Sequence, residues 1–301
     1  MNNNTLTNSS VSFSVASKVK DYFQLMKFTL SFTVVFSCVV CYLIAPKIVE
    51  YNWAMISLLF LAGMLVTGSA NAINQAVEKD TDAQMARTKS RPVASGRMSA
   101  TEAYSFAFLA GGIGIFMMYY FFNISSALLS AFSLFLYAFI YTPLKKINSI
   151  AVLVGAFPGA FPCLIGWVAG NDDFSIGGWI LFGIQFLWQF PHFWAIAWVA
   201  HQDYSRVGFK LLPADKGPTK FTAIQGIMYS VLMVPMGMLP NYFHFTGTIS
   251  LWIVLFCNLF IVFQSIRLYN EMNAKAARRV MFSSYIYLPI VLLSLLADKI
   301  H

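Results

Sequence analysis

The sequence predicts an all-α membrane protein, a polytopic bundle of about nine transmembrane helices arranged around a central cavity. Of its 301 residues, 58% are hydrophobic and only 11% are charged, against about 25% in an ordinary soluble domain. The mean hydropathy of +0.65 agrees. A chain with so little polar surface cannot cover itself in water, which excludes a soluble globular, a disordered or a disulfide-stapled protein.

Long apolar runs define the expected helices. A transmembrane helix needs about 20 predominantly apolar residues, and backbone in lipid must satisfy its own hydrogen bonds, so these runs are helices. The expected spans are 28–46, 52–75, 101–122, 125–141, 150–170, 177–200, 221–240, 247–266 and 280–297. The spans use most of the chain, so we expect a single transmembrane domain over 21–301, preceded by a flexible polar tail over 1–20.

The segments between the apolar runs are alternately basic and poor in charge, and this alternation supports the expected boundaries of the helices. Runs two, four, six and eight each end in a basic segment, and the other turns are short and poor in charge. With the N-terminus in the cytoplasm, only Lys47 and Lys299 of the 20 Lys and Arg residues fall outside. The net charge of +8 is therefore an orientation signal. It predicts a cell inner membrane protein whose function lies on the cytoplasmic side.

The four cysteines give no sign of a metal or redox site. They all lie inside apolar runs, and although two of them form a CxxC, that motif has no partner pair. We interpret them as small packing residues. The cysteines are Cys38, Cys41, Cys163 and Cys257.

The most informative polar motif lies where the second run ends. If that helix continues, Asn74, Glu78 and Asp82 fall at i, i+4 and i+8 on one face, with Asn71 on the same side. Carboxylate and amide oxygens are ligands for a hard cation, and Mg²⁺ is usually held by one or two carboxylates plus substrate phosphates. Polar groups at membrane depth are costly, so this pattern predicts a functional site.

Cations follow the acidic motif directly. Arg87, Lys89 and Arg91 come next, and Pro92 ends the segment. Carboxylates that hold a metal, beside cations that hold phosphate oxygens, are what a metal–diphosphate site needs. The alternative is a solvated juxtamembrane loop, which explains the cations but not the one-face row of acids and amides.

The sixth run contains Gln189, Pro191 and His192 within an otherwise apolar helix. Pro191 is expected to kink it. His192 has two open interpretations, a helix-packing residue or a contact to a porphyrin or metal. In the fifth run, Gly155 and Gly159 form a small-x-x-x-small face that predicts close helix packing.

Together these segments resemble the UbiA superfamily of intramembrane prenyltransferases and, more closely, its haem-farnesylating branch, the haem O synthases. The resemblance covers most of residues 20–298. The acidic motif and the following Arg-Thr-Lys-Ser-Arg-Pro mark the superfamily. The Trp-Gln-Phe-Pro-His-Phe-Trp run and the Asp-Tyr segment after it indicate the haem branch. The chain departs from the superfamily pattern at Glu78, usually Asp, and at Val207, where other branches place a second acid.

The resemblance implies transfer of a farnesyl group from farnesyl diphosphate to a vinyl group of haem b, with Mg²⁺ as cofactor. The product, haem O, would serve terminal oxidase assembly, with haem A synthase or assembly factors as partners. The implied metal ligands and catalytic residues are Asn74, Glu78, Asp82 and Asp203. The implied substrate-binding residues are Lys27, Asn71, Arg87, Lys89, Arg91, Lys145, His192, Tyr204 and Lys210.

Three alternatives stay open on the sequence alone. The first is a prenyltransferase of the same kind whose acceptor is an aromatic quinone precursor. A cation-coupled transporter would use the carboxylates as an ion site, although a site near the midplane would suit transport better. A haem-binding assembly protein would bind the acceptor without turnover.

Overall fold

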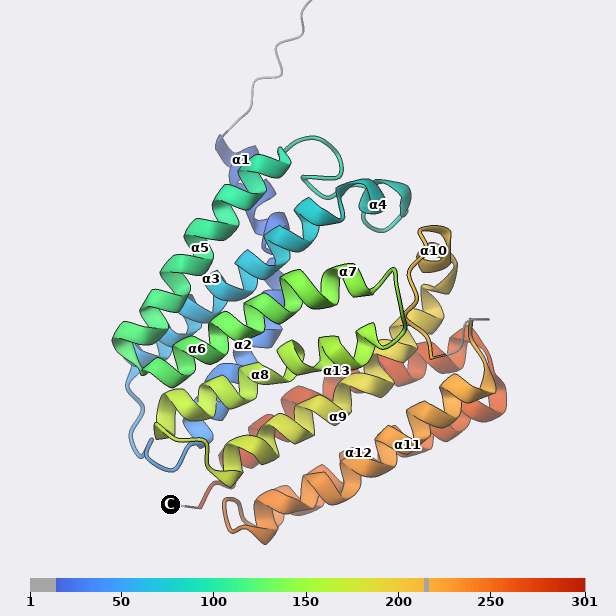
Figure 1. Cartoon of the computed structure of the whole chain (residues 1–301). Coiled ribbons are helices and arrows are strands. Elements are labelled where there is room, and N and C mark those ends of the chain that lie inside the picture. Colours follow the sequence, from blue (N-terminus) through green and yellow to red (C-terminus); the bar gives the residue numbers. More distant parts are fainter. Residues whose placement is uncertain (1–14, 214–216, 301) are drawn as a thin grey trace, which may run out of the picture.

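The computed structural model describes residues 15–213 and 217–300, and the first 14 residues of the expected tail lie outside them. The described residues form helices joined by short segments (Figure 1). Within the described ranges, one isolated β-bridge joins Thr246 and Lys299. The elements are α1 (Val15–Leu25), α2 (Phe28–Ile44), α3 (Trp53–Val77), α4 (Lys79–Gln84), α5 (Ala100–Phe121), α6 (Ile124–Phe135), the π-helix η1 (Leu136–Tyr141), α7 (Thr142–Leu144), α8 (Ala151–Asn171), α9 (Ile176–Val199), α10 (His201–Arg206), α11 (Lys220–Tyr242), α12 (Thr248–Glu271) and α13 (Ala274–Ala297).

All nine expected spans are confirmed as helical. Among the described residues, eight helical stretches are long and apolar enough to cross a membrane, and the bent pair α1–α2 supplies the ninth. The largest differences are at α12 and α13, which together run almost without interruption from 248 to 297. The charged residues at 267–279 lie in the last turns of α12 and the first turns of α13. Asn273 caps the start of α13, accepting a hydrogen bond from the Ala276 amide at 2.8 Å.

The long helices pack side by side, with α8 and α9 at the centre. Figure 1 shows them running between two ends of the molecule, one bearing α1, α4 and α10 and the other bearing the short turns. The apolar windows of α8 and α9 are 72% and 61% buried, more than those of the other spans. Neighbours α2, α6, α11 and α13 contact this pair.

Close packing around α8 depends on glycines, as the sequence predicts. A Cβ on Gly159 would lie 1.9 Å from Oε1 of Gln189, and one on Gly155 would lie 2.6 Å from the Tyr141 ring. A Cβ on Gly166 would also meet an atom at 1.9 Å, the backbone oxygen of Cys38. Gly166 is the more restricted position, because a backbone atom cannot move aside as a side chain can. Gln189 packs against Gly159, and its amide nitrogen donates to the Ala156 carbonyl at 2.9 Å.

The cysteines among the described residues are free.

The first span is broken near the charged end of the bundle. α1 and α2 meet at 51°, and Lys27 takes a left-handed conformation at the break (φ 48°). Side chains of α3 bind the carbonyls that the break frees, as backbone at a helix end requires. Gln75 donates to the carbonyls of Gln24 and Leu25, both at 2.9 Å. Asn71 donates to that of Met26 at 3.1 Å.

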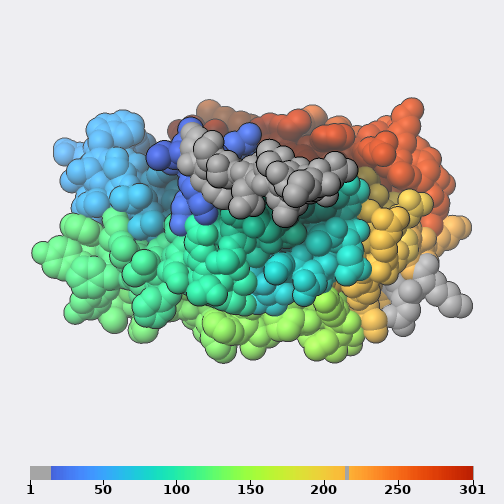
Figure 2. Space-filling model, turned by 90° about the horizontal axis from the view of Figure 1, so that it is seen from above, coloured from blue at the N-terminus to red at the C-terminus, as the bar shows by residue number. Residues whose placement is uncertain are grey.

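α1 begins inside the segment that we expect to be a flexible tail. The expected boundary at residue 20 is therefore too late, because residues 15–20 are already helical. Ion pairs anchor this helix, with Lys18 contacting Glu102 of α5 at 3.0 Å and Asp21 contacting Arg97 at 2.9 Å. Figure 2 looks onto this end of the molecule, where the segment after α3 adjoins α10.

Candidate active site

A row of three oxygen-bearing side chains lies where α3 meets α4. α3 ends at Val77, but the helical hydrogen bonds continue across the junction. Glu78 N donates to Asn74 O at 2.9 Å, and Asp82 N donates to Glu78 O at 2.7 Å. Asn74, Glu78 and Asp82 therefore keep the expected i, i+4, i+8 relation, and all three are buried. Asp80, on the other face, is exposed.

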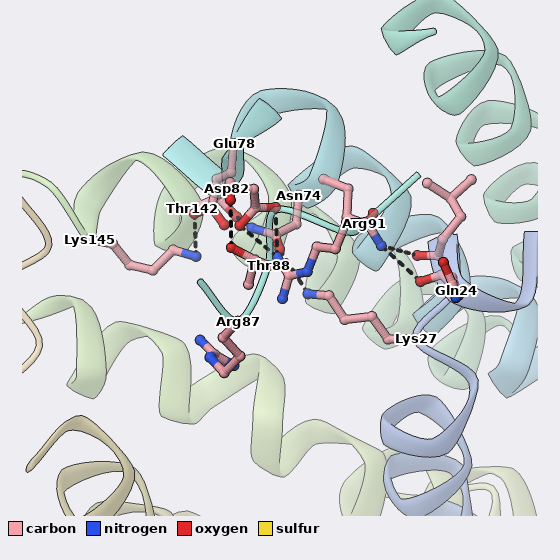
Figure 3. A network of polar contacts seen from close by, with 12 residues as sticks. Gln24, Lys27, Asn74, Glu78, Asp82, Arg87, Thr88, Arg91, Thr142 and Lys145 are labelled. Atoms are coloured by element: carbon pink, nitrogen blue, oxygen red, sulfur yellow. Dashed lines mark hydrogen bonds and ion pairs between the residues drawn. The ribbon is translucent and has the colours of Figure 1, made fainter. Parts of the chain in front are cut away.

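Each member of the row has its own cation (Figure 3). Nη1 of Arg91 donates to both carboxylate oxygens of Asp82, at 2.8 and 2.7 Å. Lys145 forms an ion pair with Glu78, and Nζ of Lys27 donates to the Asn74 amide oxygen at 2.9 Å. These six residues come from four segments of the chain and are called the charged cluster below.

The charged cluster sets three basic side chains against two carboxylates. Burial, with Arg91 and Lys145 nearby, lowers the pKa of Lys27 to about 7. Figure 3 shows Lys145 approaching from one side of the acids and Lys27 and Arg91 from the other. An anion bound here would favour the charged form of Lys27. The cluster is therefore suited to bind an anionic group near the end of the bundle.

The segments that carry the cations are held by secondary contacts. Arg97 fixes the loop after α4 to α1, since its guanidinium also donates to Gln24 Oε1 at 2.9 Å and to Ser90 O at 3.0 Å. Thr88 donates to the Asp82 carbonyl at 2.9 Å. Lys145 is framed by the rings of Tyr141 and Phe209, at 4.9 and 5.3 Å.

The second polar loop joins the first. Nη2 of Arg87 donates to the Tyr204 hydroxyl at 2.9 Å, and its guanidinium lies 5.5 Å from that ring. The backbone N–H of Lys210 donates to the Lys145 carbonyl at 2.8 Å. A pocket of about 300 Å³ lies beside this junction, between the end of α9, α10 and residues 208–212. The site and the pocket share one end of the bundle.

The remaining expected site residues take different positions. Lys89 and the Lys210 side chain are exposed, and Asp203 is partly exposed on α10. No group of three His, Cys, Asp or Glu that could hold a metal occurs within the described part of the chain, so Asp203 does not complete such a group with Glu78 and Asp82. Asn71 contacts the α1–α2 break. Its role toward substrate, like that of the others, stays a prediction.

His192 lies within α9, where α13 covers it. Its Nδ1 is 2.8 Å from the Ser284 hydroxyl oxygen. The Trp188 ring stacks on the imidazole with centroids 4.6 Å apart, and Tyr285 meets it edge-on at 5.2 Å. α9 continues as one helix through Pro191.

Sequence reasoning missed several residues that shape the site. Thr142 lies 3.5 Å from the Asn74 amide nitrogen and donates to the Tyr137 carbonyl at 2.9 Å. It follows η1, a π-helix, and such segments are frequent at functional sites. No local pattern marks a π-helix in the sequence. Gln75, which supports the α1–α2 break, could have been found as a polar residue inside an apolar run.

The donor set fits a hard divalent cation bound together with a phosphate. Two carboxylates and an amide oxygen share one face, which suffices for Mg²⁺ when substrate phosphates supply further ligands. The three cations of the charged cluster are then placed to meet phosphate oxygens. A membrane bundle with carboxylates and basic side chains gathered at one end has the features of an intramembrane enzyme that acts on a phosphorylated substrate.

The chain belongs to the UbiA prenyltransferase family, whose model matches residues 34–286. It is a multi-pass membrane enzyme of that family. A protoheme IX farnesyltransferase of Cytophaga hutchinsonii is 43% identical over 289 residues, which are 95% of this chain and all of that protein. The enzyme of the same name from Flavobacterium johnsoniae is 40% identical over 95% of this chain and 96% of its own length.

Solved structures confirm the fold. A structure of digeranylgeranylglyceryl phosphate synthase matches with a TM-score of 0.78 at 22% identity, covering 93% of this chain and 98% of that one. A UbiA homologue from Archaeoglobus fulgidus, bound to GPP and Mg²⁺, matches with a TM-score of 0.67 at 13% identity, covering 91% of this chain and 99% of that one. At these identities, the likeness concerns the fold.

Proposed function

We propose that this chain transfers a farnesyl group from farnesyl diphosphate to a vinyl group of haem b, giving haem O. The observation that carries the proposal is the match, over nearly full length, to relatives that bear the name protoheme IX farnesyltransferase. The charged cluster supports the donor half, because its three basic side chains suit a diphosphate. Membership of a prenyltransferase family rules out the transporter and the assembly protein as the primary function.

The acids and amide of the charged cluster would hold Mg²⁺, with Asp203 as a further candidate ligand. When bound, the metal would neutralise charge on the diphosphate and favour its departure. Lys27, Arg91 and Lys145 would exchange their present partners for phosphate oxygens. The more exposed Arg87, Lys89 and Lys210 would draw the anion to the site.

The reaction needs an electrophile protected from water. The carbon–oxygen bond of farnesyl diphosphate breaks, diphosphate leaves with the electron pair, and an allylic cation remains. A vinyl carbon of haem b forms the new carbon–carbon bond, and water then adds with loss of a proton to give the hydroxyethylfarnesyl group. Rings at the site, among them Tyr141 and Phe209, would shield the cation.

The charge distribution supports a cytoplasmic active site. The basic segments and the charged cluster lie at one end of the bundle, and Lys47 and Lys299 lie toward the other. By the positive-inside rule, we place the protein in the cell inner membrane with its N-terminus and site facing the cytoplasm. The product would then pass to haem A synthase or terminal oxidase assembly factors.

The test is a reaction of the purified full chain with haem b, farnesyl diphosphate and Mg²⁺ in detergent, read by mass spectrometry. We expect a farnesyl-hydroxyethyl haem that disappears with EDTA and returns with added Mg²⁺. A parallel reaction offers an aromatic quinone precursor. Prenylation of that acceptor without any haem product would overturn the assignment in favour of the quinone-type alternative.

A further inference from the structure

The contact between α9 and α13 at His192 has a fixed hydrogen-bond direction. Nδ1 of His192 lies 2.8 Å from Oγ of Ser284. That hydroxyl in turn donates to the Met281 carbonyl at 2.6 Å. Two oxygens at that distance need a hydrogen between them, and a carbonyl has none to give. The single hydroxyl hydrogen of Ser284 is therefore engaged, and its oxygen accepts from His192.

This direction assigns the tautomer of the imidazole. Nδ1 must carry the hydrogen, so Nε2 of the neutral ring has a free lone pair. Nε2 has no hydrogen-bond partner among the described residues but is not sealed from solvent, and His192 as a whole is more than nine-tenths buried. A free acceptor that stays accessible inside an apolar span is a candidate for ligand binding.

The imidazole is also fixed in orientation. Trp188 stacks on it with an interplanar angle of 19°, and Tyr285 meets it at 70°. The indole N–H of Trp188 donates to the Ser284 carbonyl at 2.9 Å, which joins the same two helices a second time. Both ring contacts and the Ser284 bond restrict rotation of His192, so that Nε2 points in one direction.

His192 lies close to the site end of the bundle. It precedes Val199, the last residue of α9, by seven residues, or about 10 Å along a helix axis. An acceptor bound at His192 would therefore lie about 10 Å along the helix axis from the end of the bundle that carries the charged cluster.

We propose that Nε2 of His192 is an axial ligand of the haem iron and that Ser284 is the positioning residue that holds its tautomer. The inference rests on haem b as the acceptor. Imidazole is a common iron ligand, and a metal-bound histidine almost always donates its other N–H to a fixed acceptor, as here. Ligation would hold the porphyrin in a fixed position beside α9.

Iron coordination can be measured without turnover. Ferric haem b is titrated into the purified full chain in detergent and followed by its Soret band and by electron paramagnetic resonance. We expect an imidazole-ligated spectrum for the wild type, its loss in His192→Ala, and its recovery with added imidazole. His244→Asn is the control at the opposite end, where Asn suits the left-handed backbone (φ 59°), and should leave the spectrum unchanged.

The positioning role has its own pair of variants. Ser284→Ala removes the acceptor for Nδ1 but keeps the carbonyl that binds Trp188. It should weaken haem affinity about 10–100-fold, as loss of such a partner typically does. Ser284→Thr keeps the hydroxyl and should retain the wild-type spectrum. Equal affinity in the alanine and threonine variants would overturn the role of Ser284.

The same samples are assayed for farnesyl transfer, so that the two proposals fail separately. A wild-type spectrum identical to that of His192→Ala, with haem product still formed, overturns the ligand assignment and keeps the function. An imidazole-ligated spectrum without any haem product keeps the ligand assignment and overturns the function. A folded chain that neither binds nor farnesylates haem overturns both.

Discussion

At the scale of single residues, the pairing of both acids of the charged cluster with cations decides which substitutions matter. Asp82 is fully buried and holds Arg91 through both of its oxygens. Asp80, two residues earlier, is exposed and lies on the other face. The contrast separates a residue placed to bind metal from one that contributes only to local charge.

We expect Asp82→Asn to lower turnover by about 100-fold or more, a typical loss when a charged group that stabilises the transition state is removed. Asp80→Asn should lower it only slightly. Initial rates of diphosphate release with farnesyl diphosphate and haem b provide the measurement. Equal losses in both variants would show that the one-face row does not form the metal site.

Lys145 and Lys146 offer a second matched pair. Lys145 is buried against Glu78 and framed by two rings, whereas its neighbour is exposed. Lys145→Met should raise the KM for farnesyl diphosphate by about tenfold or more, because the phosphate contact that we propose for Lys145 would be lost and Glu78 would be left unpaired. Lys146→Met should leave the KM near its wild-type value. Steady-state kinetics check this, and a shared effect would point to general surface charge.

At the scale of elements, the close approach of two helix backbones decides which residue a position can hold. α8 approaches α2 so closely at Gly166 that no side chain fits between them. The break between α1 and α2 is held by amides from α3, and this break brings Lys27 to Asn74. Packing among these helices therefore sets the geometry of the site.

Gly166→Ala should destabilise the bundle, because its Cβ would meet the Cys38 carbonyl at 1.9 Å. Overpacking of this kind typically costs about 1–3 kcal/mol or more. Gly112→Ala in α5, where nothing lies within 4 Å of an added Cβ, should be neutral or slightly stabilising. Thermal unfolding in detergent compares the two. Similar melting temperatures would contradict the close approach of α2 and α8.

At the scale of the whole molecule, the two ends of the bundle serve different purposes. One end gathers the charged cluster, the pocket and the basic loops. At the other, Lys299 ties the end of the chain to the α2–α3 turn, donating to the carbonyls of Leu43, Ala45 and Ile48 at 3.0, 2.8 and 2.7 Å. Burial lowers the pKa of Lys299.

Lys299→Met should lower the melting temperature, because three carbonyls lose their donor and hydrogen bonds to a charged group contribute about 1.5–3 kcal/mol. Lys47→Met, on an exposed residue of the same turn, should have little effect. Differential scanning fluorimetry of the purified proteins gives the comparison. An unchanged melting temperature for Lys299→Met would show that α13 is held without this contact.

The sequence by itself determined the helices and the row Asn74, Glu78 and Asp82. Apolar length and helical periodicity are local properties, and lipid permits only structures that satisfy their own backbone. The resemblance to one family added the class of reaction, prenyl transfer, and the match to the UbiA prenyltransferase family confirms that class.

Only the tertiary structure decided which cation meets which acid. Lys27, Arg91 and Lys145 come from separate segments, and no local pattern gives the distances between segments. The same holds for the α1–α2 break, the π-helix before Thr142 and the bond from His192 to Ser284, which lie 92 residues apart in the chain. Long-range packing fixes these contacts, because each depends on how two helices meet and not on the preference of either alone.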